Sequence, residues 1–367
     1  MNRTLLAGFV VAFLLISAAF LFPSSAPATA PPSQANASSQ LSLRSQVVNE
    51  LRVGDKFLLT THENPDGDAL GSLVAMHQIL GLMGKDSVMF MSEEDFPLPY
   101  EYRQLPLTEV KRELPADAES RTIVFLDCGN IDRMPVNFLQ RDDAHIVNID
   151  HHHDNTRFGT ANLVIAEASS TAEIIYGLIR ELDVDLTPSI AEALYVGLVT
   201  DTGKFQYKNT TAEAHRMAAE LIESGVDIHG VFRTLFENVP FPKLQLLARV
   251  LSRVERYDGD SLTVSFIERV DYEATGADEG YSEGIVDHIR ALQGTVVAAL
   301  IRDQLKEGRE GVRKVSLRAA EDSVDVSAIA RKEGGGGHRQ AAGFSSTRSA
   351  SELTEFLRVE VAAQLGG

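Results

Sequence analysis

Short apolar runs alternate with helical patterns from about residue 41 onward. Four runs have the length and continuity of buried strands, at 56–60, 87–91, 122–126 and 145–149. Apolar residues at helical spacing follow the first run around 73–83, and three more helices are predicted at 171–182, 189–199 and 211–224. Buried strands that alternate with helices are typical of an α/β protein whose parallel sheet carries helices on both faces.

The alternation breaks at 238–242, where the sequence reads N-V-P-F-P, and a helix over 243–254 follows. A second block has apolar runs at 262–267, 296–301 and 314–317, then a glycine run, and a final helix over 350–364. We therefore predict four parts, namely a leader and tether at 1–40, a larger α/β domain at 41–240, a connecting helix or linker at 241–259, and a smaller α/β domain at 260–367.

Composition narrows the choice of partners. The chain has 367 residues, with 34 Lys and Arg against 52 Asp and Glu, which gives a net charge of −18. This balance argues against a protein that coats long nucleic acid, because such binding depends on many Lys and Arg contacts to phosphates. The negative charge does not exclude a small anionic substrate that is bound through a metal ion. Cys128 is the single cysteine of the sequence, so a disulfide within the chain and a Cys-based zinc site are both excluded.

The first forty residues form a separate segment. Residues 5–22 are uncharged and almost entirely apolar, and a Pro-, Ala- and Ser-rich stretch follows at 23–40. Eighteen apolar residues are just enough to span a bilayer, and A-P-A at 26–28 resembles a signal cleavage site. Three interpretations stay open: a membrane anchor, a cleaved signal of an exported protein, or a misassigned start of a cytoplasmic protein.

The segment T-H-E-N-P-D-G-D-A-L-G-S at 61–72 follows the first strand and precedes the first helix. It places His62, Asp66 and Asp68 at the carboxyl edge of the sheet, where open α/β folds bind ligands. Pro65 and Gly67 predict a tight turn that aims both carboxylates the same way. The alternative is that Asp68 is simply the N-cap of the helix.

Three more segments carry ligand-type side chains: L-D-C-G with Asp127 after a strand, I-D-H-H-H with His151 and His152 after another, and D-T-G with Asp201 after a helix. We expect all four segments at one edge of one sheet. Two divalent ions bridged by a shared carboxylate need about six such ligands, and ion pairs of this kind hydrolyse phosphate esters. The mixture of carboxylate and imidazole favours Mn²⁺. The predicted metal ligands are His62, Asp66, Asp68, Asp127, His151 and Asp201.

The second block carries a candidate anion site. In G-G-G-G-H-R-Q-A-A-G-F at 334–344, backbone N–H groups of the glycines can approach an anion closely, and His338 can add positive charge. A flexible glycine linker is the alternative. Arg318, at the end of the predicted strand 314–317, is a second candidate because guanidinium binds phosphate in a fork; an ordinary surface arginine is its alternative.

The motifs H-x-x-P-D-G-D-A-x-G-S, L-D-x-G, I-D-H-H and D-T-G, in this order, resemble the DHH phosphoesterases. The later G-G-G-G-H and A-A-G-F are similar to the associated domain of the branch that contains oligoribonucleases and phosphatases of 3′-phosphoadenosine 5′-phosphate (pAp). The resemblance covers about 41–367. It implies a cleft between a catalytic domain and a substrate-binding domain, and Mn²⁺-dependent hydrolysis of short RNA from an end and of the 3′-phosphate of pAp.

The resemblance also implies residue roles. His62, Asp66 and Asp127 would hold one ion, whereas Asp68, Asp127, His151 and Asp201 would hold the other. The catalytic residues would be Asp127, as the bridging ligand, and His152, which would contact the substrate phosphate or protonate the leaving oxygen. The nucleotide would be held by Arg318, Gly336, Gly337 and His338.

Three alternatives remain. Cyclic di-AMP phosphodiesterase activity is the nearest, since relatives with both domains linearise that nucleotide. Inorganic pyrophosphatase is less favoured because its second domain lacks the G-G-G-G-H motif, and a catalytically dead nucleotide sensor is less favoured because no ligand is missing. Short oligonucleotides or nucleotides are the expected substrates, and the sequence leaves open a homodimer and membrane association through 5–22.

Overall fold

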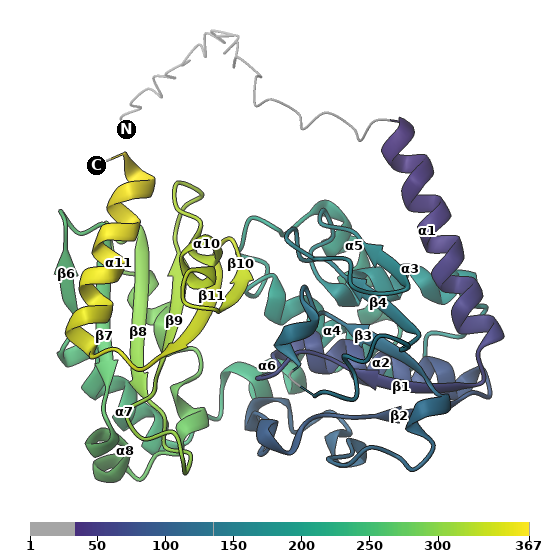
Figure 1. Ribbon diagram of the computed structural model, residues 1–367, viewed down its shortest axis with the longest axis horizontal. Helices are drawn as coiled ribbons and strands as arrows, with labels where there is room; N and C mark the ends of the chain where they lie inside the picture. Colours follow the sequence, from purple (N-terminus) through teal and green to yellow (C-terminus); the bar gives the residue numbers. More distant parts are fainter. Residues whose placement is uncertain (1–33, 135, 367) are drawn as a thin grey trace, which may run out of the picture. The chain divides into compact units, whose positions relative to one another are not determined.

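A computed structural model describes residues 34–134 and 136–366 (Figure 1). The apolar segment 5–22 lies outside this range. Within the described range, no helix has both the length and the apolar character needed to cross a membrane. Helix α1 (Gln34–Val53) begins inside the stretch predicted to be a tether.

The first sheet has five parallel strands in the order β2-β1-β3-β4-β5. The strands are β1 (Lys56–Thr60), β2 (Asp86–Met89), β3 (Thr122–Leu126), β4 (Ile146–Asp150) and β5 (Ala161–Val164). The predicted parallel sheet is confirmed, with β5 as an additional strand. Since β1, β3 and β4 are neighbours, the segments that follow them leave the same edge of the sheet side by side.

The helices of this domain are α2 (Gly67–Leu82), α3 (Thr171–Leu182), α4 (Pro188–Asp201), α5 (Ala212–Glu223) and α6 (Ile228–Phe236). Short 3₁₀ turns lie at Glu93–Asp95, Tyr100–Tyr102, Leu107–Glu109, Ala118–Ser120 and Ile131–Arg133. Helices α2 and α4 approach closely, because a Cβ atom at Gly71 would lie 2.4 Å from the carbonyl oxygen of Ala193. A Cβ atom at Gly67 would lie 2.3 Å from Oγ1 of Thr200.

The turn predicted at Pro65 and Gly67 differs in the structure. Gly67 is the first residue of α2 and does not have a positive φ. Asn64, in contrast, has a left-handed conformation with a φ of 52°. The glycine is needed for the approach of α4 and not for the turn. The chain reverses one residue before Pro65, where Asn tolerates the left-handed conformation.

The second sheet has six strands in the order β10-β11-β9-β8-β7-β6. They are β6 (Glu255–Tyr257), β7 (Leu262–Ile267), β8 (Val297–Asp303), β9 (Arg313–Ala319), β10 (Gly336–His338) and β11 (Ala341–Ser346). Neighbouring strands are antiparallel except β7 and β8, which are parallel. The helices are α7 (Phe241–Ser252), α8 (Arg269–Thr275), α9 (Ile285–Arg290), α10 (Val326–Arg331) and α11 (Ala350–Leu365), with a 3₁₀ turn at Glu279–Ser282.

Both faces of this sheet are covered. Helices α10 and α11 pack on one face through residues such as Ile329 and Leu357. Helices α7 and α9 pack on the other, where Leu246 and Val250 join Ile289 in an apolar core. Helix α7 lies in the segment predicted to connect the domains, yet its buried side chains belong to the core of the second domain.

Candidate active site

The loop after β1 presents His62 and Asp66. The Nδ1 atom of His62 lies 2.8 Å from the carbonyl oxygen of Glu63, and because a carbonyl only accepts, Nδ1 carries the proton and Nε2 is left as a free acceptor. Asp66 is the N-cap of α2, where its Oδ1 accepts hydrogen bonds of 3.1 Å from the backbone N–H groups of Asp68 and Ala69. The N-cap alternative for Asp68 is therefore wrong, because Asp66 occupies that position.

Asp68 lies inside the first turn of α2 and is buried. Its carboxylate accepts hydrogen bonds from the backbone N–H of Thr171 at 2.6 Å and of Ala172 at 3.0 Å, which are the first residues of α3. Burial, together with the nearby carboxylate of Asp127, raises the pKa of Asp68 well above its ordinary value. The N-terminus of α3 fixes the orientation of this carboxylate.

Asp127 follows β3, and its two carboxylate oxygens face different histidines. Oδ2 lies 3.7 Å from Nε2 of His62, and Oδ1 lies 3.5 Å from Nε2 of His151. The residue is buried and has a φ of 56°, a strained conformation for a side chain other than glycine. Burial raises the pKa of Asp127, but the neighbouring histidines outweigh burial and hold this pKa well below its usual range.

His151 has the hydrogen-bonding pattern of a metal ligand. Its Nδ1 lies 3.2 Å from the carbonyl oxygen of Ala168, which fixes the tautomer, and its buried Nε2 has no hydrogen-bond partner. Carboxylate oxygens of Asp127 and Asp201 each lie 3.5 Å from Nε2, and one of Asp68 lies 3.8 Å away. These distances exceed a hydrogen bond but approach the roughly 3.0–3.4 Å that separates two ligands of one ion at about 2.1 Å.

Asp201 reaches this cluster from a different kind of element. It is the last residue of α4, so three of the four predicted segments follow strands and the fourth is the end of a helix. This agrees with the expected position of D-T-G after a helix, and Asp201 lies 3.5 Å from His151 in the segment that follows β4. The close α2–α4 contact brings this helix end to the site. Asn209 holds the carboxylate of Asp201 by a 3.3 Å hydrogen bond from its Nδ2.

The ligand atoms form two groups, each spanning less than 4.8 Å: His62, Asp66 and Asp127, and Asp68, His151 and Asp201. Burial is the largest cause that raises the pKa of Asp201, to about 7. Neighbouring carboxylates outweigh burial and raise the pKa of His151 to about 10. The crowded carboxylates and the free imidazole nitrogens fit divalent cations, which would neutralise the repulsion between the carboxylates.

His152 lies beside these groups and has a fixed orientation. Its Nδ1 lies 2.7 Å from Oδ1 of the buried Asp150. Its ring stacks on that of His338, with centroids 4.0 Å apart and planes inclined by 14°. The Nε2 atom of His338 lies 3.9 Å from Oδ1 of Asp201, so the second domain contributes a side chain to the site. His153 is exposed.

The predicted anion site is part of a β-hairpin. Gly336 and Gly337 lie in β10, which pairs with β11. Gly337 has a φ of 131°, and a Cβ atom there would lie 2.5 Å from the carbonyl oxygen of Ala341, whereas the space around Gly336 is open. The flexible-linker alternative is wrong because the run is paired and packed. Arg318 lies in β9, where its Nε is 3.4 Å from Oδ1 of Asp287.

Sequence reasoning missed Thr171 and Asn209. The Oγ1 atom of Thr171 donates to Asp127 at 3.0 Å, while its backbone N–H binds Asp68. The Ser-Ser-Thr run at 169–171, where α3 begins, predicts a helix start, because Ser and Thr favour N-caps. Nothing in the local sequence shows that this helix start faces the carboxylates of two other loops.

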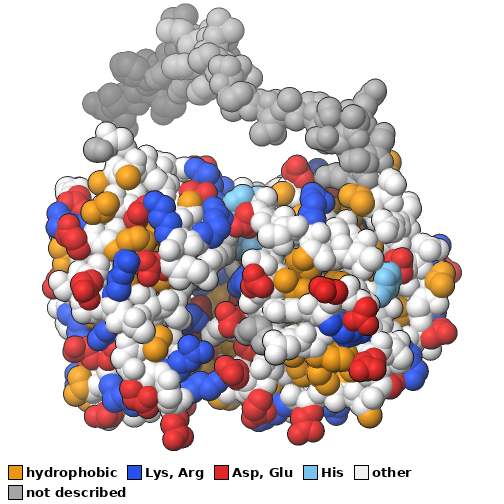
Figure 2. Space-filling model, viewed as in Figure 1, with side chains coloured by type: hydrophobic (Ala, Val, Ile, Leu, Met, Phe, Trp, Pro, Cys, Tyr) orange, Lys and Arg blue, Asp and Glu red, His pale blue; other side chains and the backbone are white. Residues whose placement is uncertain are grey.

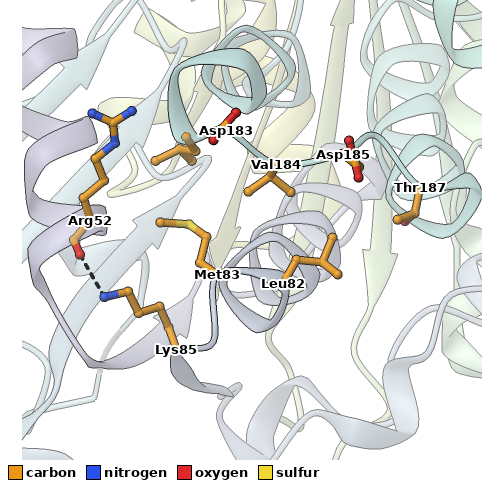
Figure 3. A pocket seen from close by; sticks show the side chains of 9 residues that line it. Arg52, Leu82, Met83, Lys85, Asp183, Val184, Asp185 and Thr187 are labelled. Carbon is orange, nitrogen blue, oxygen red and sulfur yellow. Dashed lines mark hydrogen bonds between the residues drawn. The ribbon is translucent and has the colours of Figure 1, made fainter.

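A cavity of about 510 Å³ lies elsewhere, beside the C-terminal ends of α2 and α3 (Figure 3). Lys85 donates a 2.8 Å hydrogen bond to the carbonyl oxygen of Arg52 at its wall. None of the predicted site residues lines this cavity.

On the face drawn in Figure 2, acidic and basic side chains are interspersed rather than gathered in a basic stripe. The net charge of −18 leads us to expect no such stripe.

The fold and the site define a two-domain α/β hydrolase of phosphate esters. Residues 56–198 match the model of the DHH family N-terminal domain, and residues 259–364 match the DHHA1 domain. The chain belongs to the DHH family, which confirms the predicted family and enzyme class.

The relatives that are similar to the chain include two bacterial proteins. The bifunctional oligoribonuclease and PAP phosphatase NrnA of Thermus thermophilus is 35% identical, with 78% of this chain and 82% of that protein aligned. The protein of the same name from Bacillus subtilis is 26% identical, over 83% of this chain and 93% of its own.

Among structures, an exopolyphosphatase-related protein from Bacteroides fragilis has a TM-score of 0.76 at 21% identity and covers 89% of this chain and 97% of its own. RecJ of Thermus thermophilus in complex with Mn²⁺ has a TM-score of 0.50 at 14% identity, over 89% of this chain and 55% of its own. At these identities the structures show the shared fold.

Proposed function

We propose that this chain hydrolyses short RNA oligonucleotides from an end and removes the 3′-phosphate of pAp. The names of the two relatives, oligoribonuclease and PAP phosphatase, support this substrate class. The observation that carries the proposal is the placement of Asp127, whose Oδ2 faces His62 while its Oδ1 faces His151. A carboxylate in this position suits the ligand shared by two ions.

We assign one ion to His62, Asp66 and Asp127, and the other to Asp68, Asp127, His151 and Asp201. Divalent ions held there, with Mn²⁺ as the proposed species, would lower the pKa of a water and neutralise charge on the phosphoryl oxygens. Thr171 and Asn209 donate hydrogen bonds to the carboxylates of Asp127 and Asp201. These hydrogen bonds fix the orientation of the two carboxylates.

We propose that His152 either donates a proton to the leaving oxygen or contacts the substrate phosphate. Its Nδ1 is engaged by Asp150, which leaves Nε2 for the substrate. Burial lowers the pKa of His152, but Asp150 and Asp127 outweigh burial and raise this pKa. The raised pKa favours a protonated ring. Arg318, Gly336, Gly337 and His338 would hold the nucleotide, since they come from the second domain and His338 contacts the first.

The test is a parallel assay of the full chain with pAp, a short RNA, cyclic di-AMP and pyrophosphate in the presence of Mn²⁺. We expect hydrolysis of the first two, inactivation by EDTA, and better recovery with Mn²⁺ than with Mg²⁺. Asp127→Asn, prepared identically, controls for contaminating nucleases. Cleavage of cyclic di-AMP alone would replace the proposed substrates by the cyclic dinucleotide, and pyrophosphate hydrolysis alone would make the chain a pyrophosphatase.

Membrane attachment through 5–22 and homodimer formation stay predictions. Deleting residues 1–40 should preserve hydrolysis and abolish membrane association, since every proposed ligand lies beyond this segment. Full-length protein that pellets with membranes supports an anchor, and a product about thirty residues shorter supports a cleaved signal. Uncut protein in the soluble cytoplasmic fraction contradicts both.

A further inference from the structure

Strand β9 presents two cations on the same face. Its buried residues Val315 and Leu317 belong to the core beneath α10 and α11, so the alternate residues Lys314, Ser316 and Arg318 point to the opposite face. Four residues of a strand separate the Cα atoms of Lys314 and Arg318 by about 13 Å. Two side chains at this distance can bind two different phosphates.

Both cations lie near segments of the first domain that carry proposed ligands. Lys314 Nζ donates a 3.0 Å hydrogen bond to Oδ1 of Asn64, in the loop between His62 and Asp66. Arg318 contacts Asp287, which accepts a 3.2 Å hydrogen bond from the hydroxyl of Tyr207, a few residues after Asp201. A chain of phosphates that runs along β9 would contact both side chains.

Lys314 differs from the other lysines that join the two domains. Lys306 and Lys208 form salt bridges with Glu94 and Asp322. Lys314 is partly buried, and among the described residues its ammonium has a neutral amide oxygen as hydrogen-bond partner and no salt bridge with a carboxylate. Burial and the nearby Arg302 lower the pKa of Lys314 to about 8. The carboxylates of Glu283, Glu279 and Glu63 act on this ammonium from beyond salt-bridge distance. No carboxylate of the described residues neutralises it by direct contact, so it is available to an anion.

We infer that Lys314 binds the phosphate that follows the cleaved bond of an oligonucleotide. The inference rests on the proposed function. With the scissile phosphate at the metal groups and the terminal nucleotide on the Arg318 side, the rest of the substrate leaves past Lys314. For cleavage from the 5′ end, a 5′-phosphorylated trinucleotide carries a third phosphate there, whereas pAp and a 5′-phosphorylated dinucleotide end before it.

The test compares kcat/KM of the full chain on these three substrates. In Lys314→Met, the ratio of the trinucleotide value to the pAp value should fall about tenfold, through KM rather than kcat, and the ratio of the dinucleotide value to the pAp value should change less than twofold. Lys314→Arg should restore most of the trinucleotide preference, because the charge is kept. Lys306→Met, an interdomain lysine that already has a carboxylate partner, is the matched control and should change neither ratio.

Asn64→Ala separates substrate binding from an effect on the metal loop. If Lys314 acted by holding this loop, Asn64→Ala would lower the same ratio and Lys314→Met would weaken Mn²⁺ binding in calorimetry without substrate; either result overturns the inference. An equal loss on all three substrates, or no loss on the trinucleotide, also overturns it. If the wild-type chain cleaves none of the three, the proposed function fails and the inference falls with it.

Discussion

Gly197→Ala tests whether the position of Asp68 controls activity, because it moves a proposed ligand without removing one. Gly197 lies in α4, and a Cβ atom there would be 2.7 Å from Oδ1 of Asp68 and 2.8 Å from Cβ of Ala172. Ordinary contact begins at 3.4 Å, so the carboxylate or the helix must move by about 0.7 Å.

We expect Gly197→Ala to have a small effect on the free energy of unfolding and a larger effect on kcat/KM. Overpacking costs about 1–3 kcal/mol, and alanine is the better helix former by about 1 kcal/mol, so the free energy of unfolding should drop by roughly 0–2 kcal/mol. A catalytic group has a tolerance of about 0.5 Å. We therefore expect the kcat/KM of Gly197→Ala to fall by about 10- to 100-fold, equivalent to about 1.4–2.8 kcal/mol of transition-state stabilisation.

The assay measures Mn²⁺-dependent hydrolysis of pAp, the Kd for Mn²⁺ and the urea midpoint for each variant. Gly81→Ala is the matched control, because it is also a helical glycine but has no atom within 4 Å of the added Cβ. We expect it to keep full activity and to gain up to about 1 kcal/mol in stability. A folded Gly197→Ala variant with activity within twofold of wild type would refute the argument that Asp68 must occupy this position.

Three further outcomes are expected. Asp127→Asn should reduce kcat more than about 100-fold, and retention of over a tenth of kcat would contradict its assignment as the shared ligand. Mn²⁺ should bind more weakly as the pH falls, because two proposed ligands must lose protons to bind: His151, with its pKa raised to about 10 by carboxylates that outweigh burial, and Asp201, with its pKa raised to about 7 chiefly by burial. A Kd constant between about pH 6 and 8 would argue against this. Cys128 is buried and its pKa is raised to about 12, so Ellman's reagent at about pH 8 should label it only after unfolding in urea.

The elements that the sequence predicts best are those whose apolar pattern is decided locally. The runs 56–60, 122–126, 171–182 and 262–267 have the same bounds as β1, β3, α3 and β7. Strand β5 was missed because A-N-L-V is short and contains a polar residue, and its pairing with β4 supplies the missing signal. Helix α1 was missed because a polar, Ser-rich stretch at its start gave no apolar periodicity.

Except for Asp201, the candidate ligands follow strand ends and could be proposed from the sequence, yet their orientation could not. Asp66 and Asp68 are two residues apart, and the sequence cannot decide which one caps α2 and which one turns inward. That choice depends on α3, whose first N–H groups bind Asp68 from more than a hundred residues away. A distant helix start is a tertiary feature, and no local pattern in 61–72 encodes it.

The glycines of the first motif act through the same long-range packing. Gly67 and Gly71 lie one helical turn apart on α2, where the absence of side chains makes room for the Thr200 side chain and for the backbone of α4 at Ala193. Because α4 ends at Asp201, this approach sets how far that carboxylate reaches toward His151. The motif thus supplies two kinds of residue: carboxylates that face the site, and small residues that bring the fourth segment to it. A substitution at Gly71 should consequently weaken Mn²⁺ binding through Asp201, although Gly71 itself touches none of the proposed ligands.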